Sequence, residues 1–355
     1  MSFGSQEPLR LTKSDLYSPR VDAFLDEQAL MNRALPESEP PPFLVRMFYS
    51  SYFYLSLASG LGGFIAWLIV EPLIDDRTKG FEIGAALVFP TVMGFVGLFL
   101  GAAEGIMSRN VQRAAICAAV GLGIGFAGGF VAWIMAEIMY NISVAIAVMF
   151  MKDPARAQRP TGLAFLIIMM GRGAAWAVAA IPAGIGQGIA LRENKVLLNG
   201  LLGGVLGGLL GGLLFDPISV IFTPPNGQAL VSRAIGFTMI GLMVGVFVGI
   251  VEQWTKSAWL LMRAGPLAGK QFVVFRNPTV LGSAPKADVY LFKDEAIEPR
   301  HALIHDRGGR FEIEDMDTAD GTYVNGVPIN RQVLKSGDQI VLGKTVLEFA
   351  LRESK

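Results

Sequence analysis

The chain has 355 residues, of which 52% are hydrophobic and 17% are charged. Soluble domains carry about a quarter of charged residues, so this composition argues against an ordinary cytosolic enzyme and indicates a membrane protein. Thirty basic and thirty acidic side chains cancel, so no overall field attracts nucleic acid. The chain has a single cysteine, Cys117, so we expect no intrachain disulfide. One cysteine and only two histidines also argue against a zinc site. We expect no metal and no cofactor.

Residues 1–45 form a polar tail that ends in the proline-rich linker 36–42. The chain does not open with a basic segment and a short apolar core, so we expect no cleaved signal peptide. Residues 20–35 fit a short amphipathic helix. A partly ordered tail that rests on the rest of the protein is the interpretation we favour.

Residues 46–256 are predicted to form a glycine-rich transmembrane domain of six helices. About 20 apolar residues are needed to cross a bilayer, and six stretches are long enough: 51–71, 84–107, 114–136, 166–190, 196–215 and 233–252. The third stretch continues to residue 151, either as a longer helix or as a segment in the interface. Six spans place both termini on one side of the membrane.

The apolar region shows a threefold internal repeat. Each odd-numbered span carries an acid nine residues after the start of a Gly-Gly pair: Glu71, Glu137 and Asp216. Spans four and six carry Arg172 and Arg233 at matching positions, sixteen residues before a Gly-Ile pair. We interpret the domain as three helical hairpins related by duplication.

These five charges are predicted to lie at one membrane face, and two interpretations remain open. They form the mouth of an ion or proton route, or they form interfacial ion pairs that hold the hairpins together, such as Glu137 with Arg172. We favour ion pairs, because the acids end spans and do not sit in mid-bilayer. Pro72 and Pro217 are expected to stop two of the helices.

Glycines recur every four residues, as in the ladder Gly200, Gly204, Gly208 and Gly212. Lipid provides no hydrophobic drive between helices, so small residues let backbones approach and gain dispersion contacts. We expect these glycine zippers to pack the helices, with a substrate passage as the alternative. The same ladders allow association into a homo-oligomer under either interpretation.

Residues 257–355 change to short strands separated by turn signals. The predicted strands are 271–275, 279–281, 289–291, 302–305, 310–315, 322–324, 339–342 and 345–350. Many short strands at close spacing predict an all-β sandwich. The fold class is therefore multi-domain, with a polytopic α-helical membrane domain followed by a β-sandwich.

The C-terminal sequence resembles a forkhead-associated (FHA) domain. The segments 282–283, 298–302, 320–326 and 334–343 follow one another in the order and spacing of that family, over about a quarter of the chain. The resemblance implies an eleven-stranded sandwich whose loops at one end bind phosphothreonine peptides. Loop charge alone barely favours an orientation with both termini in the cytoplasm. The resemblance decides the orientation, because it implies that the domain, and with it both termini, is cytoplasmic.

Three residues depart from the family pattern. Ser283 stands where the family has arginine, Glu298 where it has serine, and Asp320 where it has asparagine. In the family the first two contact phosphate and the third holds the peptide backbone. A phosphate carries nearly two negative charges, so Glu298 repels it, and Arg300 is the one positive charge beside the expected pocket.

The candidate peptide-binding residues are Ser283, Glu298, Arg300, His301, Asp320, Thr322 and Asn325. No nucleophile accompanies His301, so we expect it to tie the loop structurally. Asn325 with Gly326 indicates a tight turn. We expect a domain that kept the FHA fold and lost ordinary phosphothreonine affinity. Three alternatives remain for such a domain. It binds an unphosphorylated or basic surface through Glu298 and Asp320, it packs on another domain, or these two acids have no functional effect.

Nothing in the sequence resembles an active site. The predicted function is a non-enzymatic integral protein of a bacterial or archaeal plasma membrane. It displays a cytoplasmic FHA-type module to a protein partner, phosphorylated or not, as a scaffold or signalling adaptor, with no nucleic acid involved. The alternative is a channel or small transporter whose membrane domain is gated by the FHA-like module.

Overall fold

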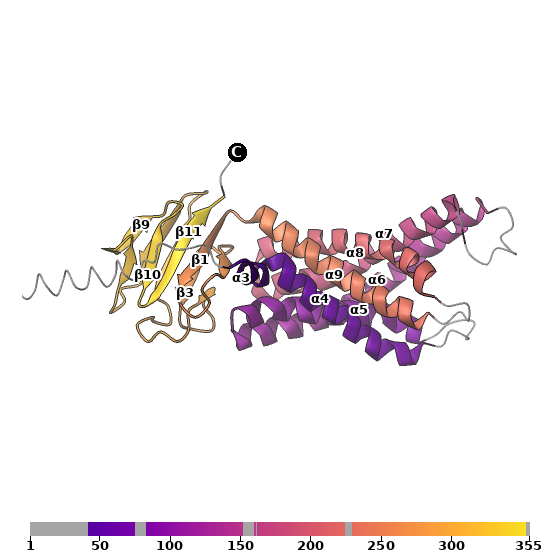
Figure 1. Ribbon diagram of the computed structural model, residues 1–355, viewed down its shortest axis with the longest axis horizontal. Helices are drawn as coiled ribbons and strands as arrows, with labels where there is room; N and C mark the ends of the chain where they lie inside the picture. The colour runs from indigo at the N-terminus through magenta and orange to yellow at the C-terminus, as the bar shows by residue number, and fades with distance from the viewer. Residues whose placement is uncertain (1–41, 75–82, 152–159, 161, 224–228, 353–355) are drawn as a thin grey trace, which may run out of the picture.

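The computed structural model describes residues 42–74, 83–151, 160, 162–223 and 229–352. The amphipathic helix predicted at 20–35 lies outside these residues. The described chain forms a long helical bundle with a β-sandwich at one end (Figure 1).

Six helices of the bundle are long and apolar enough to cross a membrane. A short helix α3 (Phe43–Phe48) precedes them. The spans are α4 (Ser51–Val70), α5 (Ile83–Met107), α6 (Val111–Val148), α7 (Leu163–Leu191), α8 (Asn194–Phe222) and α9 (Leu230–Thr255). These six helices and the sandwich after them confirm the predicted fold class.

Helices α6 and α8 both extend further than the sequence predicts. The third span is one continuous helix of 38 residues, which is the first of its two predicted forms. The expectation that Pro217 stops a helix is wrong, because Pro217 lies inside α8, which continues to Phe222. A proline removes one backbone hydrogen bond and a neighbouring helix can stabilise the turn that remains. Pro72 does end α4, in a 3₁₀ turn over Glu71–Leu73.

The bundle forms a closed ring, in which each helix packs on the next in sequence and α9 packs back on α4. Glycines lie where backbones approach most closely. A Cβ on Gly184 of α7 would collide with the main chain of Gly200 on α8, and one on Gly97 of α5 with Gly121 on α6. Such close approach is what small residues permit at helix interfaces in lipid.

The sandwich has eleven strands in two sheets. The first sheet has the order β2-β1-β11-β10-β7-β8, and the second has the order β4-β3-β5-β6-β9. The strands are β1 (Ala258–Ala264), β2 (Gln271–Val273), β3 (Thr279–Gly282), β4 (Val289–Tyr290), β5 (Ala302–Asp306), β6 (Phe311–Asp315), β7 (Thr322–Val324), β8 (Val327–Ile329), β9 (Arg331–Val333), β10 (Gln339–Leu342) and β11 (Thr345–Leu351). All pairings are antiparallel except that of β3 with β4.

Three strands were not predicted: β1, β8 and β9. Strand β1 follows the last span after two residues and lies inside its sheet, where Leu260 pairs with Phe349 of β11. The sandwich core is apolar and fully buried, with Leu260, Ile304, Ile313 and Phe349 all inaccessible to solvent.

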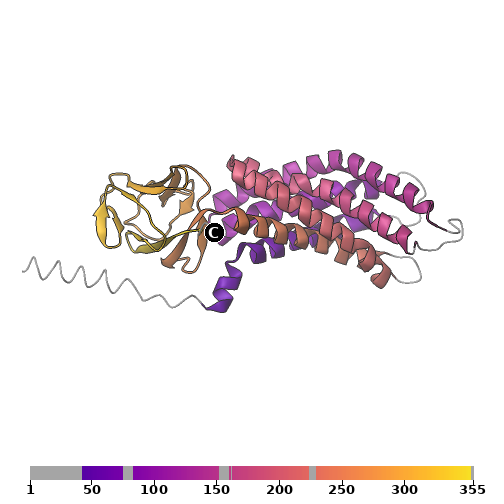
Figure 2. The ribbon, with the colours of Figure 1, turned by 90° about the horizontal axis from the view of Figure 1, so that it is seen from above.

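The sandwich sits directly on the end of the bundle, as two views at right angles show (Figures 1 and 2). Lys270, which is 1% exposed, pairs with Glu104 of α5 at 3.2 Å. Arg276 bonds to the Glu193 carboxylate and to the Leu191 carbonyl, both at 2.6 Å. These contacts join the two domains through a nearly inaccessible lysine and a partly exposed arginine.

Candidate protein-recognition site and membrane charges

Three loops of the sandwich meet at one of its ends: 283–288, 291–301 and 316–321. The Ser283 amide donates to the Glu298 carbonyl at 2.9 Å, which joins the first two loops. The Ala319 amide donates to the Glu298 carboxylate at 3.0 Å, which joins the second loop to the third. The structure therefore brings Ser283, Glu298 and the third loop together.

His301 is fully buried beneath these loops. Its Nδ1 accepts a hydrogen bond from the Glu298 amide at 3.2 Å, so the proton of the neutral ring belongs on Nε2. Nε2 then donates to the Gly321 carbonyl at 3.1 Å. The ring connects the second and third loops and has no access to a peptide.

Thr322 is also buried, and its hydroxyl donates to the Asp315 carboxylate at 2.6 Å. Thr318 donates to the same carboxylate through its hydroxyl and its amide. Burial acts to raise the pKa of Asp315, but these hydrogen bonds outweigh burial and the pKa lies below its usual value. Sequence reasoning missed Asp315 and Thr318, although Asp-x-x-Thr is a local side-chain-to-backbone motif.

Asn325 lies apart from the three loops. It forms a two-residue turn with Gly326 between β7 and β8, and both residues have positive φ, of 52° and 78°. Its side chain bonds to the Asp338 carboxylate and to the Gln339 amide. Because this turn is at the opposite end of β7 from loop 316–321, Asn325 supports the turn and not the loop cluster.

Three candidate residues present side chains at the surface of the loop cluster: Glu298, Arg300 and Asp320, all exposed. Ser283 is half-buried. Within the part of the chain that the structure describes, Arg300 has no ion-pair partner. The cluster thus offers two carboxylates and one guanidinium to a partner.

Four of the five membrane charges form two ion pairs. Arg233 holds Glu71 with two bonds, of 2.8 and 2.6 Å, and both side chains are 13% exposed. Arg172 lies 2.9 Å from Asp216. Its second nitrogen donates to the Tyr140 hydroxyl at 2.9 Å, a partner that sequence reasoning missed.

Glu137 does not pair with Arg172 as predicted. It is exposed on α6, and its carboxylate accepts a hydrogen bond from Asn141 at 2.9 Å. The helical turn explains the difference, because Ala136 and Tyr140 face the bundle while Glu137 points away from it. Over the described ranges, no three His, Cys, Asp or Glu side chains gather closely enough to hold a metal ion.

Comparisons with known proteins agree with the sandwich fold. The FHA domain family matches residues 279–343. The oxoglutarate dehydrogenase inhibitor of Corynebacterium efficiens is 41% identical over 93 residues, which are 26% of this chain and 65% of that protein. The glycogen accumulation regulator GarA of Mycolicibacterium smegmatis is 35% identical over 105 residues, which are 30% of this chain and 66% of that protein.

Among solved structures, an FHA domain from a study of phosphothreonine-dependent interactions is 23% identical, with a TM-score of 0.26. It covers 28% of this chain and 100% of its own chain. The FhaA FHA domain, solved in complex with the intracellular domain of Rv3910, is 25% identical with a TM-score of 0.24. It covers 26% of this chain and 99% of its own.

The C-terminal domain of this protein is an FHA domain, a module that binds protein partners. The chain spans just under two thirds of the length of the curated relatives it matches. One of these relatives is named as an inhibitor and the other as a regulator.

Proposed function

We propose that this chain is a non-enzymatic scaffold or signalling adaptor that holds an FHA domain at the cytoplasmic face of a prokaryotic plasma membrane. The six apolar helices support membrane insertion. The ion pair of Lys270 with Glu104 and that of Arg276 with Glu193 support a fixed position of the domain on the bundle. The relatives named as an inhibitor and a regulator support action through binding to other proteins.

The observation that carries the choice of partner is the Glu298 carboxylate. It lies in the loop cluster and accepts a hydrogen bond from the Ala319 amide. An incoming anion would otherwise use this donor. Ser283 supplies no positive charge beside it. Charge-assisted hydrogen bonds from arginine are the strongest contacts to a phosphate, and here a carboxylate occupies that surface. We infer recognition of an unphosphorylated or basic segment.

The proposal can be tested with the full chain in proteoliposomes that capture proteins from a lysate. Half of the lysate is treated with a protein phosphatase. We expect the same proteins to be captured from both halves, and a charge-reversed Glu298→Lys variant to lose them. Loss of capture after phosphatase treatment would contradict the proposal.

A channel or small transporter gated by the FHA domain is the second candidate. It is supported by the charged residues near the ends of the spans, four of which form two pairs. The two ion pairs favour the scaffold, because a carboxylate held by a guanidinium is not free to bind a passing ion. Ion flux into the same proteoliposomes distinguishes the candidates: the scaffold predicts none, whereas a channel predicts flux that Arg233→Gln alters.

A further inference from the structure

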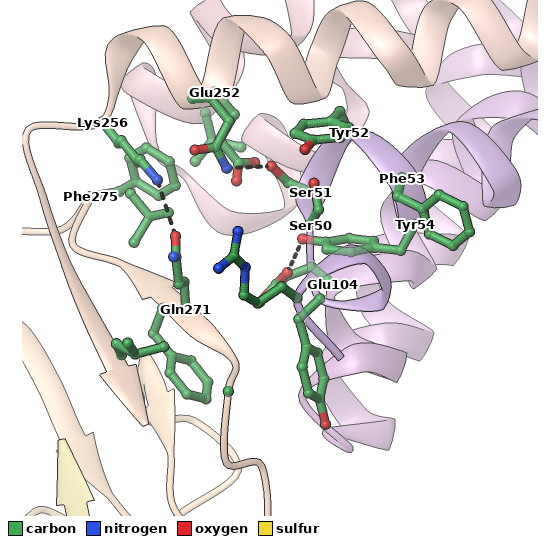
Figure 3. Close-up of a pocket in the computed structure, with 18 of the residues that line it drawn as sticks. Ser50, Ser51, Tyr52, Phe53, Tyr54, Glu104, Glu252, Lys256, Gln271 and Phe275 are labelled. Atoms are coloured by element: carbon green, nitrogen blue, oxygen red, sulfur yellow. Dashed lines mark hydrogen bonds between the residues drawn. The ribbon is translucent and has the colours of Figure 1, made fainter. Parts of the chain in front are cut away.

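A cavity of about 770 Å³ lies between the bundle and the FHA domain. Its walls come from α3, from the ends of the six long helices that face the sandwich, and from the first two strands with the loops beside them (Figure 3). This volume is typical of ligand pockets, which measure roughly 300–1,000 Å³. The cavity touches the FHA loop cluster only through Asp288 at the end of loop 283–288, and the paired charges at the far ends of the helices take no part in it.

The cavity lies where two membrane spans end. The span of α4 begins at Ser51 and that of α9 ends at Thr255. Next to these ends Tyr52 is 50% exposed and Trp254 is 65% exposed. Exposed tyrosine and tryptophan at span ends are typical of the depth of lipid headgroups. The cavity is therefore at the level at which a headgroup would enter.

Most acids around the cavity form ion pairs, and one does not. Glu104 pairs with Lys270, Asp288 with Arg276, and Glu348 with Arg263. Glu252 forms no ion pair among the residues that the structure describes, although Lys256 and Lys270 lie near enough to attract it. The neighbouring Gln253 amide donates to the Ser51 hydroxyl at 2.9 Å.

Two arginines that line the cavity also lack a carboxylate partner within the described chain. Arg113 donates to the main-chain carbonyl of Asp288, and Arg46 on α3 is exposed. A charged group that faces a cavity without a counter-ion gains most from a ligand of opposite charge. The cavity therefore offers one site for a cation and one for an anion.

The ends of the helices match this division. The α4 N-terminus carries positive potential, and its N-cap residue Ser50 has a buried hydroxyl without a hydrogen-bond partner. The C-terminal turn of α9 carries negative potential and holds Glu252. Figure 3 shows Ser50, Ser51 and Glu252 around the same hollow. Anion and cation sites thus lie side by side on two neighbouring antiparallel helices.

We infer that this cavity binds a phosphate-and-amine zwitterion, the phosphoethanolamine headgroup of a membrane phospholipid. Arg46, Arg113 and the start of α4 bind the phosphate. Glu252 binds the ammonium, with the ring of Tyr52 in the same wall. The bound headgroup touches α4, α9 and the FHA domain at once, so it stabilises the junction between the domains.

The test uses the full chain released from nanodiscs that contain equal parts of phosphatidylethanolamine, phosphatidylcholine and phosphatidylglycerol. Native mass spectrometry measures which lipid stays bound. We expect phosphatidylethanolamine to be retained at least fivefold over phosphatidylglycerol. Glu252→Gln should abolish this preference, and Arg46→Gln should lower retention of all three lipids. Glu295→Gln, an exposed acid outside the cavity, is the matched control and should behave as the natural chain.

Equal or greater retention of phosphatidylglycerol by the natural chain, or a Glu252→Gln variant that behaves as the control, would overturn the inference. Free O-phosphoethanolamine in detergent is the second arm. A rise in melting temperature with this compound, without lipid retention, would overturn the lipid source. Retention of phosphatidylethanolamine with no effect of the free compound supports a lipid, and does so even if a variant fails to fold.

Discussion

In the proposed function, the carboxylate of Glu298 sets the response of the FHA domain to a phosphate. It is exposed, it lies beside Ser283, and it accepts a hydrogen bond from the Ala319 amide. We expect the double substitution Ser283→Arg with Glu298→Ser to raise phosphothreonine-peptide affinity at least tenfold, because it replaces a repulsive charge by a guanidinium. Isothermal titration with matched peptides measures the change. An unchanged affinity would mean that other loop residues block the phosphate.

The Glu71–Arg233 pair allows a test of its structural role. Removing one partner of a buried pair costs about 3–5 kcal/mol, because a charge is left uncompensated. We expect Arg233→Gln to lower the melting temperature of the full chain in detergent, and the exchange of Glu71→Arg with Arg233→Glu to recover part of the loss. Recovery would be absent if the two residues contributed independently.

The pH dependence of the FHA domain follows from Asp315. Hydrogen bonds hold the pKa of this folded carboxyl below its usual value of about 3.9. Its stabilisation is therefore complete above pH ~4 and is lost as the pH falls through the lower, folded pKa. We expect Asp315→Asn to flatten the acid limb of the unfolding curve, followed by near-ultraviolet circular dichroism. An unchanged acid limb would show that other groups set it.

The sequence located the important charged residues of the bundle, but it did not correctly predict all of their ion-pair partners. Regular spacing pointed to Arg172 and Arg233, but the partner of Arg172 depends on the rotation of α6, which places Tyr140 inward and Glu137 outward. The buried Lys270 gave no signal of its own, since its partner Glu104 lies 166 residues away in sequence.

Among the helices, glycines differ in what surrounds them. A Cβ on Gly184 would overlap the main chain of Gly200, whereas a Cβ on Gly123 would meet nothing within 4 Å. We expect Gly184→Ala to destabilise the bundle by roughly 1–3 kcal/mol, since α7 and α8 must separate. Gly123→Ala is the matched control and should be neutral or stabilising by up to about 1 kcal/mol. Unfolding in graded SDS compares them, and equal effects would contradict a role of close packing.

Elements were predictable where their physical signal is strong. Runs of about 20 apolar residues have few solutions other than a span, so all six helices were located. Strand β1 was missed because its apolar sequence follows α9 directly, with no turn signal between them. The end of α8 was misplaced because a proline near a helix end does not by itself break the helix when packing supports the turn.

At the scale of the whole molecule, Lys270 joins the two domains. It is nearly inaccessible, pairs with Glu104, and lies over the rings of Tyr54 and Phe272. We expect Lys270→Gln to loosen the FHA domain, because the half-buried Glu104 then loses its ion-pair partner. Hydrogen exchange of residues 258–273 in the full chain should rise, while Lys286→Gln, on the domain surface, should leave it unchanged. Equal exchange in both variants would contradict this role of the pair.

Recognition of unphosphorylated segments is tested most directly by one measurement. It is the affinity of the full chain in nanodiscs for a degenerate threonine-peptide library, synthesised with and without phosphate. A domain with Glu298 and Ser283 at its loops should bind unphosphorylated members at least as tightly as their phosphorylated counterparts. A tenfold or greater preference for phosphothreonine would contradict the account and identify the protein as a working phosphopeptide receptor in the membrane.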